Sequence, residues 1–566
     1  MGILHQLPLI LEEAEIEYRK LLEKAGNEFA KSGFFGFENP DFAHKADSDI
    51  YSGDIYICDN AEYLSQLAIS KSRKIDMIYV DPPFFSRTDQ GARAEIYPSK
   101  KKSPIVRTIN AFGDIWGHDK SYYLKMLAVR LLLMRDVLSE DGTIFVHLDY
   151  HAVHEVKLIM DEIFGEERFI NEIIWAYKSG GAAKKHFSRK HDTILFYAKS
   201  DNYKFNLLKE KSYNRKLQPY HFKDVEEFQD DIGWYTLVNM KDVWQIDMVG
   251  RSSHERLNYA TQKPEQLLER IISAVTEPGD TVADFFCGSG TLAAAALKTG
   301  RHFICTDISS FAISKALKRT AGQGAAVNLY MRYPADDKNP VIETEFTIKT
   351  AVKFGHEKTA RAKAAEQAET AAQTETTAQA ETTAQAEKTA QTEAAEQAGR
   401  FVGEALKYTQ CVRLVGYKND LQNMNFGKTH SKKKKIDKKD DEIEDLLESD
   451  SMAFIDYWGI AKAFESRLTE NPAFDVDKLE VVIRPELIAK RDRAGNLQEE
   501  ISLEELPVEG LTQLSPEEPA EGLPKESAEG SPEELTEEST CEKRVIFAFD
   551  VLGNIILKDI SSENAR

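Results

Sequence analysis

Short apolar runs alternate with helix-like segments between about residues 50 and 320. The apolar runs are long enough for buried strands, whereas the segments between them repeat apolar positions every three to four residues, as amphipathic helices do. This alternation predicts an α/β domain with a mostly parallel sheet covered by helices on both faces. The expected strands are Ile75–Val80, Thr143–Leu148, Glu172–Tyr177, Thr193–Ala198, Thr281–Phe285 and His302–Cys305, and the expected helices are Tyr122–Leu138, Gln262–Thr276 and Thr291–Thr299.

The pattern changes at several points and divides the chain into six parts. Residues 1–49 read as a helical extension, and residues 201–256 are polar and aromatic without a clear period, as in an inserted recognition segment. From Glu369 a six-residue repeat (ETAAQT, ETTAQA) keeps no apolar stripe on one helix face and predicts a solvated linker. The expected parts are 1–49, 50–200 and 257–350 (the two halves of one domain), 201–256, a linker at 351–400, and a small C-terminal α+β module at 401–566.

The C-terminal module contains its own change of composition. Residues 499–540 are rich in Glu and Pro and are predicted to be a disordered insert. On either side, Leu479–Ile483 reads as a strand and Arg544–Lys558 as a hairpin around Leu552-Gly553-Asn554.

Composition narrows the class of protein. The chain has 566 residues and a net charge of -21, of which about three quarters falls after residue 350, so acidity does not argue against an anionic partner for the first part. No stretch approaches the roughly 18 apolar residues of a membrane span, and the acidic first 30 residues do not resemble a secretory signal. Five scattered cysteines argue against a disulfide framework, so we expect a cytoplasmic protein with no membrane contact.

The tetrapeptide Asp81-Pro82-Pro83-Phe84 directly follows the expected strand Ile75–Val80. Two consecutive prolines remove two backbone donors and fix φ, so the chain leaves the strand as a rigid loop. The loop presents a carboxylate, a carbonyl group and an aromatic face together, which suits a flat ring bearing an amino group. Such a loop is also a common structural turn, but its place after a parallel strand is where α/β proteins bind ligands.

A second motif joins the strand Thr281–Phe285 to a helix. Gly288 and Gly290 in Asp284-Phe285-Phe286-Cys287-Gly288-Ser289-Gly290-Thr291 allow close approach of the backbone to a ligand. Asp307 follows the next strand, at the position where an acidic residue binds ribose hydroxyls. A nicotinamide or flavin site is the alternative, although the third glycine of that fingerprint is absent.

Together these motifs resemble the amino-methylating DNA methyltransferases, which form N6-methyladenine or N4-methylcytosine. Further matches are Cys58-Asp59, Thr261-Gln262-Lys263-Pro264, the stretch Gly142–Asp149 and Asn171–Trp175. The tetrapeptide precedes the glycine motif, which is the order of the β group and is similar to type III modification subunits. Phe85-Ser86-Arg87 departs from the family, whose members often continue the tetrapeptide with Asn.

The resemblance implies a Rossmann-like class I methyltransferase fold with permuted motifs, and a function for each motif. It implies that Asp81, Pro82, Pro83 and Phe84 are catalytic, and that an adenine flipped out of duplex DNA receives a methyl group from S-adenosyl-L-methionine on its N6 amine. The implied cofactor contacts are Asp59, Gln262, Lys263, Asp284, Phe286, Gly288, Ser289, Gly290, Thr291 and Asp307. Double-stranded DNA is the implied partner, and a restriction subunit and a homodimer are compatible with the same resemblance.

Positive charge near the motifs indicates where DNA binds. Two basic loops offer phosphate contacts, and the segment 201–256 offers side chains for base contacts, namely Tyr213, Asn214, Arg215, Gln218, Trp234 and Trp244. The loop residues are Lys178, Lys184, Lys185, Arg189 and Lys190 in one loop and Lys101 and Lys102 in the other.

Several alternatives remain open from the sequence. They are an N4-cytosine methyltransferase, an RNA or protein amide methyltransferase, and a recognition subunit without catalysis. His147, Asp149, His151 and His154 do not have zinc-site spacing, so no metal is expected.

Overall fold

A computed structural model describes residues 2–32, 52–334, 341–352, 406–418, 446, 450–466, 478–502 and 541–560. Within these ranges it leaves out residues 73, 89, 100–102, 113, 115–119, 179–182, 222–224, 251–252, 260, 321–322, 324–325, 492–494 and 552–554. The chain forms two compact units, one of residues 1–342, 417–497 and 524–566, and the other of residues 343–416 and 498–523. No helix in the described residues is long and apolar enough to cross a membrane.

A 13-stranded sheet forms the centre of the first unit, in the order β11-β6-β7-β5-β2-β12-β13-β1-β14-β18-β17-β20-β21. The six strands from β5 to β14 run parallel, and antiparallel strands extend the sheet on both sides. The α/β sheet predicted from the sequence is therefore confirmed. Its strands are β1 Ser52–Ile57, β2 Ile75–Val80, β5 Leu138–Leu148, β6 Phe169–Ala176, β7 His191–Ala198, β11 Val243–Gln245, β12 Thr281–Asp284, β13 His302–Asp307, β14 Ala326–Pro334, β17 Ile455–Ser466, β18 Lys478–Lys490, β20 Cys541–Asp550 and β21 Ile555–Asp559.

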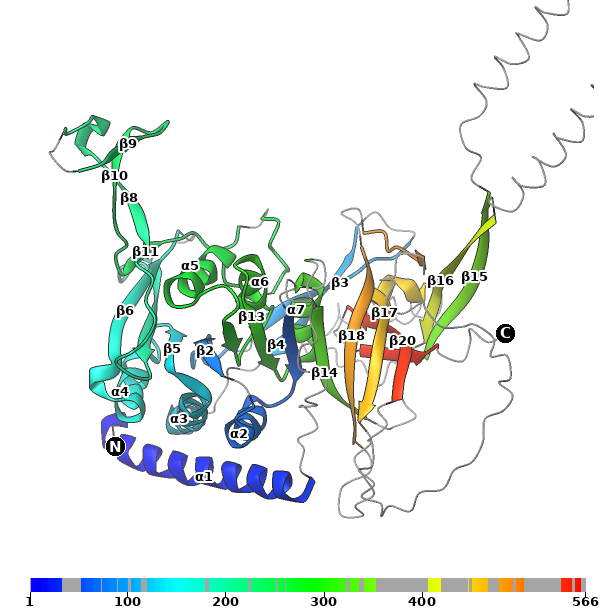
Figure 1. Cartoon of the computed structure of the whole chain (residues 1–566), viewed down its shortest axis with the longest axis horizontal. Helices are drawn as coiled ribbons and strands as arrows, with labels where there is room; N and C mark the ends of the chain where they lie inside the picture. The colour runs from blue at the N-terminus through cyan, green and yellow to red at the C-terminus, as the bar shows by residue number, and fades with distance from the viewer. Residues whose placement is uncertain are drawn as a thin grey trace, which may run out of the picture. The chain divides into compact units, whose positions relative to one another are not determined.

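Helices cover both faces of this sheet (Figure 1). One hydrophobic core lies under α1 Leu7–Ser32, α2 Asn60–Ser70, α3 Lys120–Val137 and α4 Val153–Phe164, and a second core lies under α5 Glu265–Val275, α6 Thr291–Lys298 and α7 Ser310–Thr320. Short 3-10 turns occur at Ile3–His5, Glu166–Arg168, Arg215–Leu217 and Ser451–Phe454. Burial on both faces explains why the central strands are apolar along most of their length.

Two smaller sheets belong to the first unit. The strands β8 Lys209–Tyr213, β9 Glu227–Gln229 and β10 Trp234–Asn239 form an antiparallel sheet in the segment predicted to be the recognition insert (Figure 1). The strands β3 Gln90–Ile96 and β4 Ile105–Phe112 form a hairpin shortly after the Asp81–Phe84 loop. In the second unit, β15 Val341–Val352, β16 Leu406–Lys418 and β19 Glu500–Ser502 form a three-stranded sheet.

The C-terminal strands continue the central sheet, whereas the sequence suggested a small module of its own. β18 pairs with β14 from Leu329 to Pro334, and β17 and β20 follow in antiparallel register. Asp456 on β17 is buried and forms ion pairs with Lys315 and Lys318 of α7, at 2.6 and 2.5 Å. The open edge of β14 explains this arrangement, because an unpaired edge strand offers a row of backbone donors and acceptors.

Candidate active site

A cavity of about 640 Å³ opens at the carboxyl edge of the parallel strands. The four loops after β2, β12, β13 and β1 reach it, because these strands are neighbours and their carboxyl ends meet at one edge. β2 and β12 also mark the point where the strand order reverses, which is the usual ligand crevice of such sheets. All the expected catalytic and cofactor residues except Gly290 line this cavity, namely Asp59, Asp81, Pro82, Pro83, Phe84, Gln262, Lys263, Asp284, Phe286, Gly288, Ser289, Thr291 and Asp307.

Asp81 has two oxygens in different surroundings. Oδ2 is in contact with the ammonium group of Lys263, whereas Oδ1 is buried without a hydrogen-bond partner. Burying a carboxylate oxygen unpaired is unfavourable, so Asp81, which lines the cavity, still has unused capacity to accept a hydrogen bond. The ring of Phe84 lies beside it, with its centroid 5.4 Å from the Lys263 Nζ atom.

The loop that follows Phe84 is held by Asp114. The backbone NH groups of Phe85 and Ser86 donate to the Asp114 carboxylate at 3.0 and 2.6 Å, and Asp114 itself is buried. Phe85 also packs its buried ring against Tyr123 at a centroid distance of 5.6 Å. Phe85 is therefore packed into the core and Ser86 is held through its backbone, whereas Arg87 is exposed, so the end of the tetrapeptide is anchored at residues 85 and 86.

A buried polar chain lies behind the Phe84 ring. The hydroxyl of Tyr79 and Nδ1 of His147 are 2.7 Å apart, and His147 Nε2 lies 3.3 Å from Asp192. Asp192 also accepts from the Tyr177 hydroxyl at 3.1 Å. Burial opposes ionisation of Asp192, but the hydrogen bond and charge of His147 lower its pKa overall. His147 thus has partners on both ring nitrogens and serves to position this wall of the cavity.

The glycine turn brings the backbone close to two neighbours. Gly288 has φ +49° and Gly290 has φ +70°, both in the left-handed region that favours glycine. A Cβ atom on Gly288 would lie 3.2 Å from the Tyr259 ring, and one on Gly290 would lie 2.6 Å from the Cβ atom of Ala316. The turn therefore needs glycine at both positions, although only Gly288 faces the cavity.

Two acids at the ends of β12 and β13 lie beside this turn, Asp284 buried and Asp307 half-buried. Asp307 accepts from the NH groups of Gly288 and Ser309, each at 2.9 Å, and Asp284 accepts from the NH of Phe286 at 3.0 Å. Burial raises the pKa of both carboxyl groups, and the charges of Asp81 and Asp307 raise that of Asp284 further. A positively charged ligand beside these two carboxyl groups would favour their charged forms, so the pair suits such a ligand.

Asp59 has a different role in the fold from these two acids. Its side chain caps α2 by accepting from the NH of Ala61 at 2.8 Å, and it pairs with Arg130 at 2.8 Å. About half of its side chain is exposed at the rim of the cavity. It remains available to a ligand at that end.

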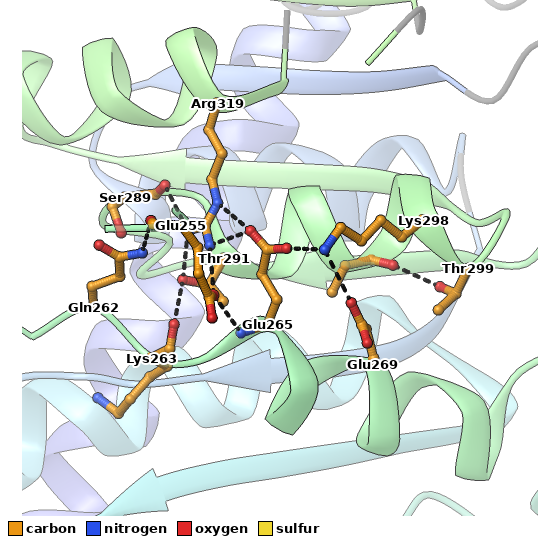
Figure 2. A network of polar contacts seen from close by, with 11 residues as sticks. Glu255, Gln262, Lys263, Glu265, Glu269, Ser289, Thr291, Lys298, Thr299 and Arg319 are labelled. Carbon is orange, nitrogen blue, oxygen red and sulfur yellow. Dashed lines mark hydrogen bonds and ion pairs between the residues drawn. The ribbon is translucent and has the colours of Figure 1, made fainter. Parts of the chain in front are cut away.

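An ion-pair network anchors the segment between residues 255 and 265 (Figure 2). The guanidinium of Arg319 binds the Glu265 carboxylate, with Nε donating at 2.9 Å, and donates to Thr291 Oγ1 at 3.0 Å. Thr291 Oγ1 in turn donates to the carbonyl oxygen of Lys263 at 3.3 Å. Burial raises the pKa of Glu265, but Arg319 and Lys298 outweigh it and lower the pKa overall. This network could not be predicted from the sequence, since its members come from three separate helices and a loop.

The basic loop between β6 and β7 lies on the same edge as the cavity. β6 runs parallel to β5, because both are antiparallel to β7, so the carboxyl end of β6 points to that edge. Lys178, Lys184, Lys185 and Arg189 are exposed there, and Lys190 is half-buried. The Arg189 guanidinium lies 3.8 Å above the centroid of the Tyr150 ring, next to the end of β5. Lys101 and Lys102 lie outside the described residues.

Phe187 lies in the same loop and was not among the residues expected from the sequence to contact DNA. Its side chain is 99% exposed, between Lys185 and Arg189. Lys185 and Arg189 are exposed as well, so this aromatic side chain lies among basic ones in the loop. The signal available in the sequence was an aromatic residue inside the run KKHFSRKH.

The recognition segment is partly structural. Trp244 is buried and its indole NH donates to the carbonyl of Lys241 at 2.7 Å, and Asn214 is buried and donates to Glu227 at 2.6 Å. The interpretation of these two side chains as base-reading groups was therefore wrong, because both are used within the segment. Arg215 and Gln218 are exposed.

Comparison with known proteins places the chain in a family. The profile of the N6/N4 methylases, described as DNA methylase, matches residues 75–318. The type II methyltransferase M1.MboII of Moraxella bovis is 31% identical over 198 residues, which cover 32% of this chain and 73% of that protein. The chain belongs to this DNA methylase family.

Other members of the methylase family are similar over longer stretches. The type II methyltransferase M.EcaI of Enterobacter cloacae is 27% identical over 416 residues, covering 62% of this chain and 81% of that protein. The DNA adenine methyltransferase YhdJ of Escherichia coli is 27% identical over 275 residues, covering 46% of this chain and 81% of that protein. The methylase profile includes both the Asp81–Phe84 loop and the glycine turn, so most of the cavity lining lies within the matched region, whereas Glu17 and the Cys58–Asn60 loop precede it.

Proposed function

We propose that this methylase transfers a methyl group from S-adenosyl-L-methionine to the N6 amine of adenine at a specific site in duplex DNA, as part of restriction and modification in the cytoplasm. The observation that carries the proposal is the Asp81 carboxylate, which has one oxygen buried and unpaired and lies beside Phe84. Both residues line a cavity that Asp284 and Asp307 also line.

The cavity fits the cofactor in charge and size. Its volume of about 640 Å³ is in the range of small-molecule sites, and its buried carboxylates suit the two positive groups of S-adenosyl-L-methionine. Asp284 would hold the ammonium group, Asp307 the ribose hydroxyls and Asp59 the adenine end. Phe286, Ser289 and the backbone of the Gly288–Gly290 turn would border the methionine and sugar. Bound there, the cofactor supplies an electrophilic methyl group that an amine nitrogen can take.

The chain's own groups prepare the amine. An exocyclic amine is a weak nucleophile because its lone pair is delocalised into the ring. Hydrogen bonds from the amine to Asp81 and to the Pro82 carbonyl favour a tetrahedral nitrogen with a localised lone pair. Asp81 also lies where it can take the proton that the nitrogen releases when it is methylated. Phe84 stacks on the base and excludes water from one face.

The base must leave the duplex to reach Asp81, since its amine is paired inside the helix. The loop with Lys184, Lys185 and Arg189 would contact phosphates. Phe187, in that loop, would fill the space that the flipped base leaves in the stack, as apolar wedges do in other DNA complexes. The 99% exposure of its side chain supports this role.

Adenine is favoured over cytosine as the target by Asp at position 81, and one relative is named as a DNA adenine methyltransferase. N4-cytosine methylation is the second candidate, because the same profile covers both activities by name.

Modification-aware sequencing of DNA from cells that express the chain tests this function. We expect N6-methyladenine confined to one short motif, its loss in Asp81→Ala, and its retention in a matched variant of an exposed acid, Asp201→Ala. The cofactor should still bind to Asp81→Ala. Methylcytosine at the motif would establish the second candidate, and loss of cofactor binding in Asp81→Ala would contradict the assigned roles.

A further inference from the structure

Lys263 occupies the position where the target amine should bind, if the proposed function holds. Its ammonium group is in contact with Asp81 Oδ2, and only 10% of the Lys263 side chain and 16% of the Asp81 side chain are exposed. The same ammonium group lies 5.4 Å from the Phe84 ring centroid, on the stacking surface for the base. In this arrangement the catalytic carboxylate is partly covered by a cation of the same chain.

The backbone at Lys263 is held by hydrogen bonds, whereas its ammonium group donates only to Asp81 and, at 3.4 Å, to the carbonyl oxygen of Thr261 among the described residues. The Lys263 carbonyl accepts from Thr291, which Arg319 holds, and the neighbouring Gln262 side chain accepts from the NH of Leu257 at 2.8 Å. Figure 2 shows the Lys263 side chain pointing away from this network. A lysine has a flexible four-carbon stem and a compact charge, so it can change partners without movement of the backbone.

The charges that line the cavity give Lys263 two competing partners. Asp81, Asp284 and Asp307 line the cavity near it, whereas the cations Arg130 and Lys125 at the other end pair with Asp59, Glu13 and Glu17. The carboxylate of S-adenosyl-L-methionine brings a further negative charge that needs a cation close to the ammonium site at Asp284. Among the described residues of the lining, Lys263 is the cation on that side.

We propose that Lys263 exchanges partners, binding Asp81 before the cofactor enters and the cofactor's carboxylate afterwards. The exchange uncovers Asp81 Oδ2 for the target amine at the moment when the methyl donor is in place. Cofactor binding and capture of the flipped base are then positively coupled through one side chain, and a base is not captured before the donor is bound.

Isothermal titration of the cofactor product S-adenosylhomocysteine tests the exchange without any turnover. S-adenosylhomocysteine retains the amino and carboxylate groups of the cofactor but lacks its sulfonium charge. A direct attraction between Asp81 and that charge therefore does not contribute to the measured affinity. Asp81→Asn keeps the shape of the side chain but releases Lys263, and we expect it to tighten binding by about five- to tenfold, the size of coupling between contacting residues. Lys263→Met should weaken binding, and adding Asp81→Asn to Lys263→Met should then change nothing.

The double variant decides between direct and indirect effects. If Asp81→Asn has the same effect with and without Lys263, or if it weakens binding in the otherwise unchanged chain, the exchange is refuted. Lys263→Arg, which keeps the charge, should retain most of the affinity, and equal melting temperatures exclude unfolding as the cause. A chain with no affinity for the cofactor or its product would refute the proposed function instead, so the two failures are distinguishable.

Discussion

Gly290→Ala should destabilise the fold and abolish cofactor binding, although Gly290 does not line the cavity. The added Cβ would lie 2.6 Å from Cβ and 2.8 Å from Cα of Ala316, so α7 would have to move away from α6. Overpacking of this kind costs about 1–3 kcal/mol. The left-handed conformation at φ +70° adds ~1–2 kcal/mol for alanine, offset by ~0.4–1 kcal/mol from the less flexible unfolded chain.

Gly279→Ala is the matched control for this prediction. Gly279 has φ +92°, but a Cβ atom there would meet nothing within 4 Å, so only the conformational cost applies. Urea denaturation followed by circular dichroism should show a loss of about 1–4.5 kcal/mol for Gly290→Ala and about 1 kcal/mol for Gly279→Ala. Titration should show cofactor binding only in the control. Equal losses in the two variants would refute the steric argument.

Three further predictions concern charge and exposure. Burial alone would raise the pKa of Asp456, but Lys315 and Lys318 lower it below its usual range. The interaction of Asp456 with the two lysines therefore stabilises the fold at pH values above the ordinary pKa of Asp, and this stabilisation is lost on acidification. Asp456→Asn should therefore lose about 3 kcal/mol of unfolding free energy at pH 7. Denaturation curves at acid pH should show a smaller difference between the variant and the unchanged chain. The pH dependence expected for Asp284 is the opposite. Its pKa is raised, so the folded state binds the proton more tightly and the stability that Asp284 contributes falls as pH rises. Asp284→Asn should therefore stabilise the unliganded chain more at pH 8 than at pH 5. Phe187→Ala should lower methylation kcat/KM about tenfold, as loss of one stacked aromatic does, and reduce the fluorescence of 2-aminopurine at the target position, whereas Phe205→Ala should leave both unchanged.

The sequence predicts the strands well where an apolar run ends at a clear polar boundary. The run Ile75–Val80 coincides with β2 at both ends. β5 starts at Leu138, five residues before the expected Thr143, because pairing with β2 continues across a bulge through residues that read as a turn. α5 begins at Glu265 rather than Gln262, because Pro264 stands at its N-cap.

The pairing of segments that lie far apart in the chain could not be predicted from the sequence pattern. The apolar pattern indicates strands near residues 480 and 550, but not that they join the edge of β14. Asp81 and Lys263 were each singled out by motif, yet their contact spans 182 residues and depends on how β2 and the segment before α5 meet. The buried positions of Trp244 and Asn214 were missed for the same reason, since composition does not distinguish an exposed aromatic or amide from a packed one.

The joining of β18 to β14 has a practical consequence for how the methylase can be shortened. A chain ending near residue 340 would retain every residue of the cavity, and would seem from its motifs to be a complete enzyme. It would nevertheless leave β14 as a bare edge and remove the acid at position 456 that neutralises Lys315 and Lys318. Such a fragment should pair edge to edge with copies of itself and precipitate, so the shortest well-behaved form of the enzyme includes the strands that follow the repeat.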